Sequence, residues 1–375
     1  MGTSPRPLPH IRELDAVRGL AALMVFFHHL CFTSIDPAAW GRGINLLYNI
    51  SGWGAYGVDL FFVLSGFLIT SLLIKDRVHT AYYRDFYWKR ALRILPLYLL
   101  CLLGLLLFVR HSGSYVLLSA LFISNFAWLF HVQATGPFWT LAIEEQFYLL
   151  WPTVVRRRSV SELRRWAVTI ILGCILLRFI AAFFGHHNYF FTFFRCDGLA
   201  AGALLACWYE RRQTTPPNTL REHIAIGAAI LTGTFIFVVT SLYSPSPDAN
   251  ALFAALNQTA AALLCAGAIA FLIAHSGKPW LGLFRSPLLI FFGLISYAMY
   301  MTHIYILLAY DHLRGPLLPG NLVSFATRFF GVLALTILLC LLTRYLIELP
   351  AISLRRFVLT KPTPKAEIES TLLTQ

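Results

Sequence analysis

The chain has 375 residues, of which 58% are hydrophobic and 13% are charged, and its mean hydropathy is +0.68. These values exclude an ordinary soluble protein, because soluble domains carry about 25% charged residues. The net charge of +13 would suit a nucleic-acid binder, but most lysines and arginines lie in short clusters between apolar stretches. We therefore expect an all-α polytopic membrane protein without a nucleic-acid partner.

Eleven stretches have the length and apolar character of candidate spans, since a hydrocarbon core of about 30 Å takes roughly 20 helical residues. In chain order they cover 16–35, 56–74, 92–109, 115–131, 139–155, 166–184, 194–209, 223–242, 255–274, 287–308 and 325–346. The N-terminal segment has no short apolar core followed by a cleavage site, so we expect the first stretch to be a retained span. The tail after Pro350 is short and polar, so we expect any chemistry to lie within the bundle.

Basic residues gather in the N-terminal segment, at 75–93, 156–165, 211–221 and 278–285, and after residue 343. The positive-inside rule places all these clusters in the cytoplasm. The clusters at 75–93 and 156–165 are then separated by an even number of spans, although three apolar stretches lie between them. We expect 115–131, which runs into the turn signal HVQATGP, to be re-entrant or peripheral, with 139–155 as the alternative.

This topology predicts about ten transmembrane helices with both termini in the cytoplasm. Residues 1–11 would form an N-terminal tail, 12–355 the membrane domain and 356–375 a disordered tail. The seven cysteines occur singly and without metal-ligand spacing. We expect neither a disulfide framework nor a bound metal.

Ionisable residues inside these spans are costly in hydrocarbon and tend to be functional. His29 follows Arg18 in the first span and, at about 1.5 Å per residue, lies about 16 Å deeper, near the bilayer midplane. Glu144, Glu145 and Arg178 fall at about the same depth in their own spans. We expect a glutamate to fix the tautomer of His29 and to stabilise its charged form, with Arg178 as an alternative partner of one glutamate.

Two points stay open at this stage. His28 points about 100° away from His29 around a helix, so we expect only one of the two rings to face a site. The alternative to a site is that these buried groups only pair helices with one another.

The segment RDFYWKRALRILPLY carries Arg90 and Arg93 on one helical face near the membrane surface. One interpretation is retention of topology and contact with anionic lipid headgroups. The other is recognition of a phosphorylated cofactor that enters from the cytoplasm, because guanidinium groups match phosphate oxygens.

Seven segments resemble, in the same order, motifs of the membrane acyltransferase-3 family. They are RELDAVRGLAALMVFFHH (12–29), GVDLFFVLSGFLIT (57–70), KRALRILPLY (89–98), PFWTLAIEEQFYLLWP (137–152), RCDGLAAGALLA (195–206), ISYAMYMTHIYI (295–306) and IELP (347–350). The resemblance covers Arg12 to about Arg355. It implies transfer of an acyl group, commonly acetyl from acetyl-CoA, to a hydroxyl of a sugar, glycan or other small acceptor. Some members carry a fused extracytoplasmic hydrolase-like domain; we expect none here, which disfavours acceptors that depend on one.

The resemblance also assigns roles to matching positions. It implies that Arg18 and His29 are essential and that Arg90 and Arg93 form the paired arginines of the cytoplasmic loop. The remaining matches are Trp139, Glu144, Glu145, Tyr148, Arg195 and Asp197. His28 departs from the pattern, since it occupies a position that is usually hydrophobic or tyrosine.

Other motif residues have two interpretations each. Asp59, Ser65 and Gly66 are candidates for the acceptor path, and the alternative for the glycines of this segment is that they allow close helix approach. Tyr297 and His303 would face the middle and the outer half of the membrane, to bind the acceptor or to pack. Glu348 and Pro350 are predicted to stop the last helix and to supply a salt bridge.

Together these features predict an integral membrane O-acyltransferase. Acyl-CoA would dock from the cytoplasm on Arg18, Arg90 and Arg93, and His29 would act as the general base. An acyl group carried on His29 is the alternative mechanism. A proton-coupled transporter or flippase of a lipid or glycan is the main rival function, and a binding or regulatory membrane protein is the third. We expect the bacterial inner membrane as the location.

Overall fold

The computed structural model describes residues 11–32, 42–133, 136–186, 190–214, 219–243, 251–315, 317 and 321–358. Within these ranges the chain forms helices and no strands, which confirms the predicted all-α class. The predicted terminal tails lie almost wholly outside the described residues, as do residues 33–35 of the first predicted span and 134–135 of the predicted turn. Residues 356–358, which were assigned to the disordered tail, belong instead to a helical turn, α15 (Arg355–Val358).

Long helices make up most of the described chain. They are α1 (Arg12–Phe32), α3 (Gly57–Lys75), α4 (Tyr82–Phe108), α6 (Phe138–Arg157), α7 (Val160–Phe183), α9 (Asp197–Thr214), α10 (Thr219–Tyr243), α11 (Ala251–Ala274), α12 (Pro287–Arg314) and α13 (Leu322–Thr343). Each overlaps one predicted span. The shorter elements are α2 (Arg42–Gly52), η1 (Trp53–Tyr56), α5 (Gly113–Ala120), η2 (Ser124–Phe130), α8 (Thr192–Arg195), η3 (Pro279–Arg285), η4 (Arg344–Glu348), α14 (Leu349–Ser353) and α15.

Eight helical segments of the described chain are long and apolar enough to cross a membrane. Helices α6 and α9 are 20 and 18 residues long but are less apolar, because each carries two acidic residues and two arginines. The apolar stretch at 115–131 divides into α5 and η2, separated by Phe122 with a positive φ of 54°. An eight-residue helix rises only about 12 Å, so α5 alone does not cross the bilayer. The number of ten spans stays a prediction.

Glycines set the closest helix contacts in the bundle. Gly19 of α1 faces the carbonyl oxygen of Leu289 in α12, and Gly293 of α12 faces the backbone of Asp15 in α1. Between α3 and α9, Gly66 meets the backbone of Leu199, and a glycine of α9 meets α3 in return. Small residues let helix backbones approach closely in membranes. The interpretation of Gly66 as a packing glycine is therefore confirmed.

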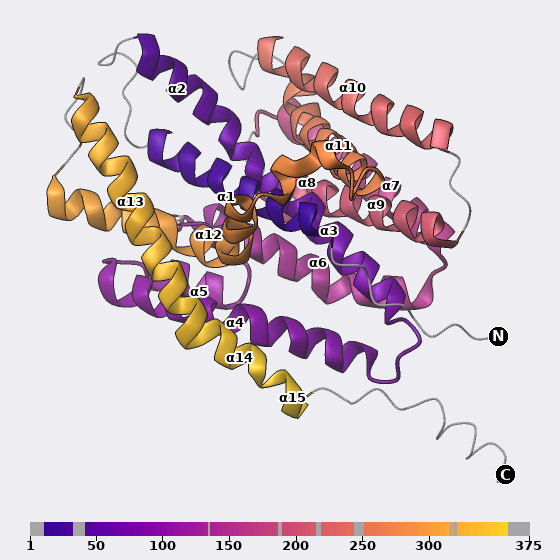
Figure 1. Ribbon diagram of the computed structural model, residues 1–375, viewed down its shortest axis with the longest axis horizontal. Coiled ribbons are helices and arrows are strands. Elements are labelled where there is room, and N and C mark those ends of the chain that lie inside the picture. The colour runs from indigo at the N-terminus through magenta and orange to yellow at the C-terminus, as the bar shows by residue number, and fades with distance from the viewer. Residues whose placement is uncertain are drawn as a thin grey trace.

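Figure 1 shows most long helices running side by side, with α10 at one edge of the bundle and α4 and α13 toward another. Helices α1, α3 and α12 lie between these edges, and α1 packs against both of the others. Leucines and phenylalanines on the outer faces are exposed, for example Leu107 and Phe108 of α4. In a bilayer such a surface faces lipid, so the polar residues of the central helices are enclosed by the bundle.

The C-terminal end of the bundle differs from the prediction. Pro350 does not stop the last helix, because α13 continues through the π-helical turn η4 into α14, which ends at Ser353. Pro350 lies in the first turn of α14, where its missing N–H is tolerated. Glu348 is buried in the π-helical turn.

Candidate functional site

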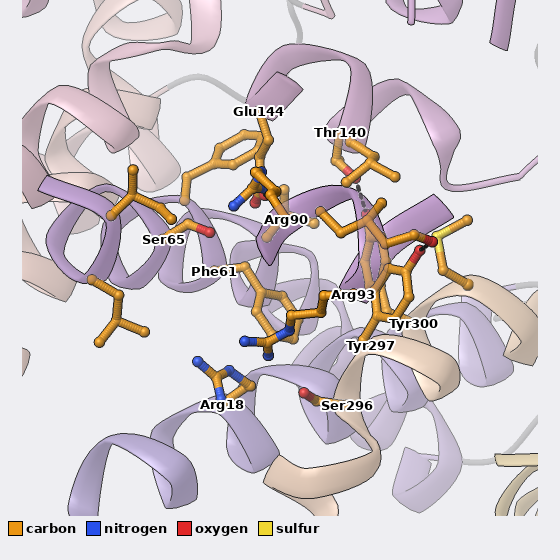
Figure 2. A pocket seen from close by; sticks show the side chains of 17 residues that line it. Arg18, Phe61, Ser65, Arg90, Arg93, Thr140, Glu144, Ser296, Tyr297 and Tyr300 are labelled. Carbon is orange, nitrogen blue, oxygen red and sulfur yellow. Dashed lines mark hydrogen bonds and ion pairs between the residues drawn. The ribbon is translucent and has the colours of Figure 1, made fainter. Parts of the chain in front are cut away.

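A pocket at the centre of the bundle is lined by three arginines, and we call it the arginine pocket. Its walls come from five helices: α1, α3, α4, α6 and α12. Arg18, Arg90 and Arg93 supply the positive charges, Ser65 and Glu144 further polar groups, and the remaining lining is largely aliphatic and aromatic (Figure 2). The cavity volume is about 170 Å³. An apolar cavity with a few convergent charges is typical of a ligand site.

Arg90 is already held by protein groups. Its Nε donates to Glu145 Oε1 at 2.8 Å, its Nη2 lies 3.4 Å from Glu144 Oε2, and its guanidinium stacks 3.5 Å from the centroid of the Tyr148 ring. Tyr148 is buried and donates its hydroxyl to Glu144 at 3.3 Å. The structure therefore places both glutamates on Arg90. This differs from the predicted pairing of a glutamate with His29, and it makes Arg90 part of the pocket wall.

Arg93 and Arg18 are the more available cations. Among the described residues, Arg93 makes no hydrogen bond or ion pair, and its side chain is exposed to the pocket. Arg18 lies 3.5 Å from Asp15 on its own helix, and Figure 2 shows its guanidinium pointing toward that of Arg93. Two guanidinium groups that face the same space would repel one another unless an anion joined them. The pair therefore makes the pocket suited to a phosphate or carboxylate group.

A second cavity lies against the arginine pocket and contains both histidines of α1; we call it the histidine chamber. Its lining includes His28, His29, Asp59, Trp139 and Arg195, and its volume is about 510 Å³. Val58 of α3 and Tyr300 of α12 line both cavities. One layer of side chains thus separates the arginines from the histidines.

The spacing of Arg18 and His29 explains how one helix serves both cavities. Eleven residues correspond to three helical turns plus about 20°, so both side chains lie on one face of α1, about 16 Å apart. On α12, Tyr297 lines the arginine pocket, Tyr300 lines both cavities and Ile304 lines the chamber. These two helices form a continuous wall along the two cavities.

The contacts of His29 define its tautomer. His29 Nδ1 lies 2.9 Å from the carbonyl oxygen of Val25 and 3.2 Å from Nε2 of His303. Nδ1 of His303 lies 2.9 Å from the carbonyl oxygen of Met299, which can only accept, so this Nδ1 carries the proton of that ring. His303 Nε2 is then an acceptor, and His29 Nδ1 must be the donor. The neutral His29 ring therefore has an unprotonated Nε2, which is the form that a general base needs.

The prediction that only one histidine faces the site is wrong, because His28 and His29 both line the chamber. Positions 100° apart on a helix both reach a cavity that spreads over η1, α3 and α11 as well as α12. His28 Nδ1 lies 3.0 Å from the carbonyl oxygen of Ser51, so this ring is anchored to the segment that precedes η1. Of the two rings, His29 is the one that contacts another histidine across the bundle.

Two buried ion pairs belong to the same region. Arg195 Nη2 lies 3.0 Å from Asp59 Oδ1 at the edge of the histidine chamber. Arg178 is fully buried and binds Asp197 at 2.9 Å, and Thr259 donates to the same carboxylate at 2.6 Å. The suggested pairing of Arg178 with a glutamate is therefore wrong. The side chain of Arg178 points from α7 toward α9 and α11 rather than toward α6.

The structure also places the remaining predicted residues. Ser65 and Tyr297 line the arginine pocket, and the hydroxyl of Tyr297 donates to the carbonyl of Ile94 at 2.8 Å. Trp139 lines the histidine chamber, 4.8 Å from the ring of Phe190. Tyr297 therefore lies on the arginine side of the layer between the cavities.

Several lining residues were not predicted from the sequence, and two of them, Tyr300 and Gln258, are polar residues that the site uses. Tyr300 shares a helical face with Tyr297, three residues earlier, and hydrogen-bonds Thr140 at 2.9 Å. Gln258 lines the histidine chamber from α11, a helix whose other residues are nearly all apolar. A polar side chain in such a helix is itself a signal of function.

Comparison with known proteins identifies the family of this chain. The profile of the acyltransferase-3 family, described as an acyltransferase domain, matches residues 11–345. "Putative O-acetyltransferase SACOL0978" of Staphylococcus aureus (strain COL) is 27% identical over 383 aligned residues, which cover 93% of this chain and 58% of that protein. "O-acetyltransferase OatA" of Staphylococcus aureus (strain NCTC 8325 / PS 47) is 30% identical over 253 residues, 59% of this chain and 37% of that protein.

The chain thus spans little more than half the length of the first of these relatives, 58%. No solved structure matches it. The family profile, in contrast, covers nearly the whole described part of the chain, including both cavities. The chain belongs to the membrane acyltransferase-3 family.

Proposed function

We propose that the chain is a membrane O-acetyltransferase that moves an acetyl group from acetyl-CoA to a hydroxyl of a carbohydrate or another small acceptor. The observation that carries this proposal is the pair of cavities that share Val58 and Tyr300, one lined by arginines and the other by a histidine of defined tautomer. Family membership and the names of the relatives support an acyl transfer reaction. We place the protein in the bacterial inner membrane with both termini in the cytoplasm.

The arginine pocket is the proposed donor site. Coenzyme A carries phosphates that match guanidinium groups, and Arg93 and Arg18 present two such groups. Arg90 would contribute indirectly, by fixing the position of α4, the helix that also carries Arg93. Under the positive-inside topology, these arginines lie toward the cytoplasm, where acyl-CoA is available.

The histidine chamber is the proposed acceptor site. In the reaction, His29 Nε2 removes the proton of the acceptor hydroxyl, the oxygen bonds to the thioester carbonyl carbon, and the carbon–sulfur bond breaks. The imidazolium then returns the proton to the sulfur of coenzyme A. His303 supports this cycle, because its Nε2 accepts a hydrogen bond from the Nδ1–H of His29 while His29 carries the additional charge. Transfer through an acyl group on His29 is the alternative order of the same steps.

The test uses the purified protein in lipid nanodiscs with labelled acetyl-CoA and methyl glucoside as an acceptor probe. We expect release of coenzyme A and label on the sugar in the wild type, and loss of both in His29→Ala with an unchanged melting temperature. His312→Ala is the matched control, since His312 is an exposed histidine at the end of α12. A protein that neither binds nor turns over acetyl-CoA would refute the enzyme and favour a transporter.

A further inference from the structure

The wall of the histidine chamber contains two buried polar atoms without hydrogen-bond partners among the described residues. One is Nε of Arg195, a residue that is only 8% exposed and whose Nη2 is used by Asp59. The other is the side-chain oxygen Oε1 of Gln258. Both residues line the chamber, one from α8 and the other from α11.

These two atoms have complementary chemistry. Nε of Arg195 is a donor and Oε1 of Gln258 is an acceptor. Leaving such groups unpaired inside a protein is costly, so a ligand that satisfies both gains affinity there. A hydroxyl group accepts and donates at one oxygen, and it is the simplest group that matches both atoms.

Asn257, the residue before Gln258, does not share the unpaired amide oxygen of Gln258. Asn257 accepts a hydrogen bond from Tyr56 at 2.7 Å and donates one to Thr240 at 3.0 Å, so both ends of its amide have partners within the protein. Asn257 does not line the chamber. The two neighbouring amides of α11 therefore differ, since one is used by the protein and the other keeps an unused acceptor.

Arg195 is oriented by its surroundings. Asp59 holds one end of the guanidinium at 3.0 Å, and the ring of Phe62 lies 5.6 Å from its centre. A guanidinium held in this way can present Nε without losing further side-chain freedom. Trp139, next to Phe190, adds an aromatic surface to the same chamber, on which the apolar face of a sugar ring can pack.

We propose that Arg195 and Gln258 form a subsite that binds a second, non-reacting hydroxyl of the acceptor while His29 acts on the first. The proposal deepens the proposed function, and it specifies a polyhydroxylated acceptor, such as a sugar, over an alcohol with a single hydroxyl. It rests on the proposed function only for the role of His29. Binding of a sugar to the chamber is independent of the transfer reaction.

The first experiment measures binding without acetyl-CoA. Methyl glucoside is titrated into wild type and Gln258→Met, which removes the acceptor oxygen at similar volume, and into the control Asn257→Leu. We expect about a tenfold weaker affinity for methyl glucoside in Gln258→Met, because the free energy of one hydrogen bond corresponds to a change of about that size. In Asn257→Leu we expect an unchanged affinity and a lower melting temperature. Arg195→Lys, which keeps a charge beside Asp59 but lacks Nε, should resemble Gln258→Met.

The second experiment measures turnover with the same variants. We expect Gln258→Met to raise the methyl glucoside concentration at half-maximal rate about tenfold, with an unchanged dependence on acetyl-CoA. In the wild type, cyclohexanol should be a poorer acceptor than methyl glucoside, and Gln258→Met should reduce this preference. A wild type that binds methyl glucoside no better than Gln258→Met overturns the subsite. Sugar binding that depends on Gln258 without any release of coenzyme A retains the subsite and refutes the proposed function.

Discussion

Replacement of His303 by phenylalanine tests the assigned tautomer of His29. The ring of His303 is 2% exposed, and phenylalanine fills a similar volume beside Phe26, so the change mainly removes the acceptor Nε2. Two acceptors define the tautomer of His29, and in this variant only the carbonyl oxygen of Val25 remains beside its Nδ1. The charged form of His29, which develops during proton removal, loses one hydrogen bond.

A hydrogen bond to a charged group contributes about 1.5–3 kcal/mol. Because about 1.4 kcal/mol corresponds to a tenfold change in rate, kcat should fall roughly 10- to 150-fold in His303→Phe. The concentration of acetyl-CoA at half-maximal rate should not change, since His303 does not line the arginine pocket. Release of coenzyme A with methyl glucoside as the probe measures both quantities.

Two further variants separate this role from packing. His303→Gln keeps an acceptor oxygen and should recover part of the rate. His312→Phe makes the same substitution at an exposed position of α12 and should behave as the wild type. If His303→Phe folds normally and keeps kcat within twofold, His303 does not accept a hydrogen bond from His29 in the reaction, and the assigned tautomer is wrong.

Three other substitutions test the cavities and the packing. Arg93→Ala should raise the acetyl-CoA concentration at half-maximal rate at least tenfold, the value of a charge-assisted hydrogen bond, whereas an unchanged value would remove Arg93 from the donor site. His28→Gln should keep at least a tenth of the wild-type rate and His29→Gln should not, as measured by release of coenzyme A; the reverse order would make His28 the base. Gly66→Ala should lower the free energy of unfolding by about 1–3 kcal/mol, because its Cβ would meet the backbone of α9, and an unchanged thermal melt would contradict the observed packing.

Hydropathy and charge were sufficient to predict the helical architecture. Apolar length predicts each long helix, because the bilayer imposes a minimum number of residues on a span. The predicted span at 287–308, for example, lies within α12, which begins at Pro287. The end of the last helix could not be predicted, since a π-helical turn before Pro350 lets the helix continue past the proline.

The partners of the buried charges depend on tertiary structure. Spacing along a helix gives the depth of Glu145, Arg178 and His29, but the direction of each side chain depends on which helices adjoin and how they are rotated. Glu145 meets Arg90 of α4, and Arg178 meets Asp197 of α9, and neither contact follows from spacing along a single helix. Two residues for which helix spacing predicts the same membrane depth therefore need not be neighbours.

By itself, the sequence determined a polytopic all-α membrane protein, the basic clusters that suggest its orientation, and His29 and Arg18 on one face of the first helix. Those properties follow from local periodicity and from the cost of charges in hydrocarbon. Only the tertiary structure decided that His303 accepts a hydrogen bond from His29, that Tyr300 lies between two cavities, and that Gln258 faces one of them. These contacts join segments far apart in the chain, and they depend on helix rotations that the close approach of small residues permits, as at Gly19 and Gly293.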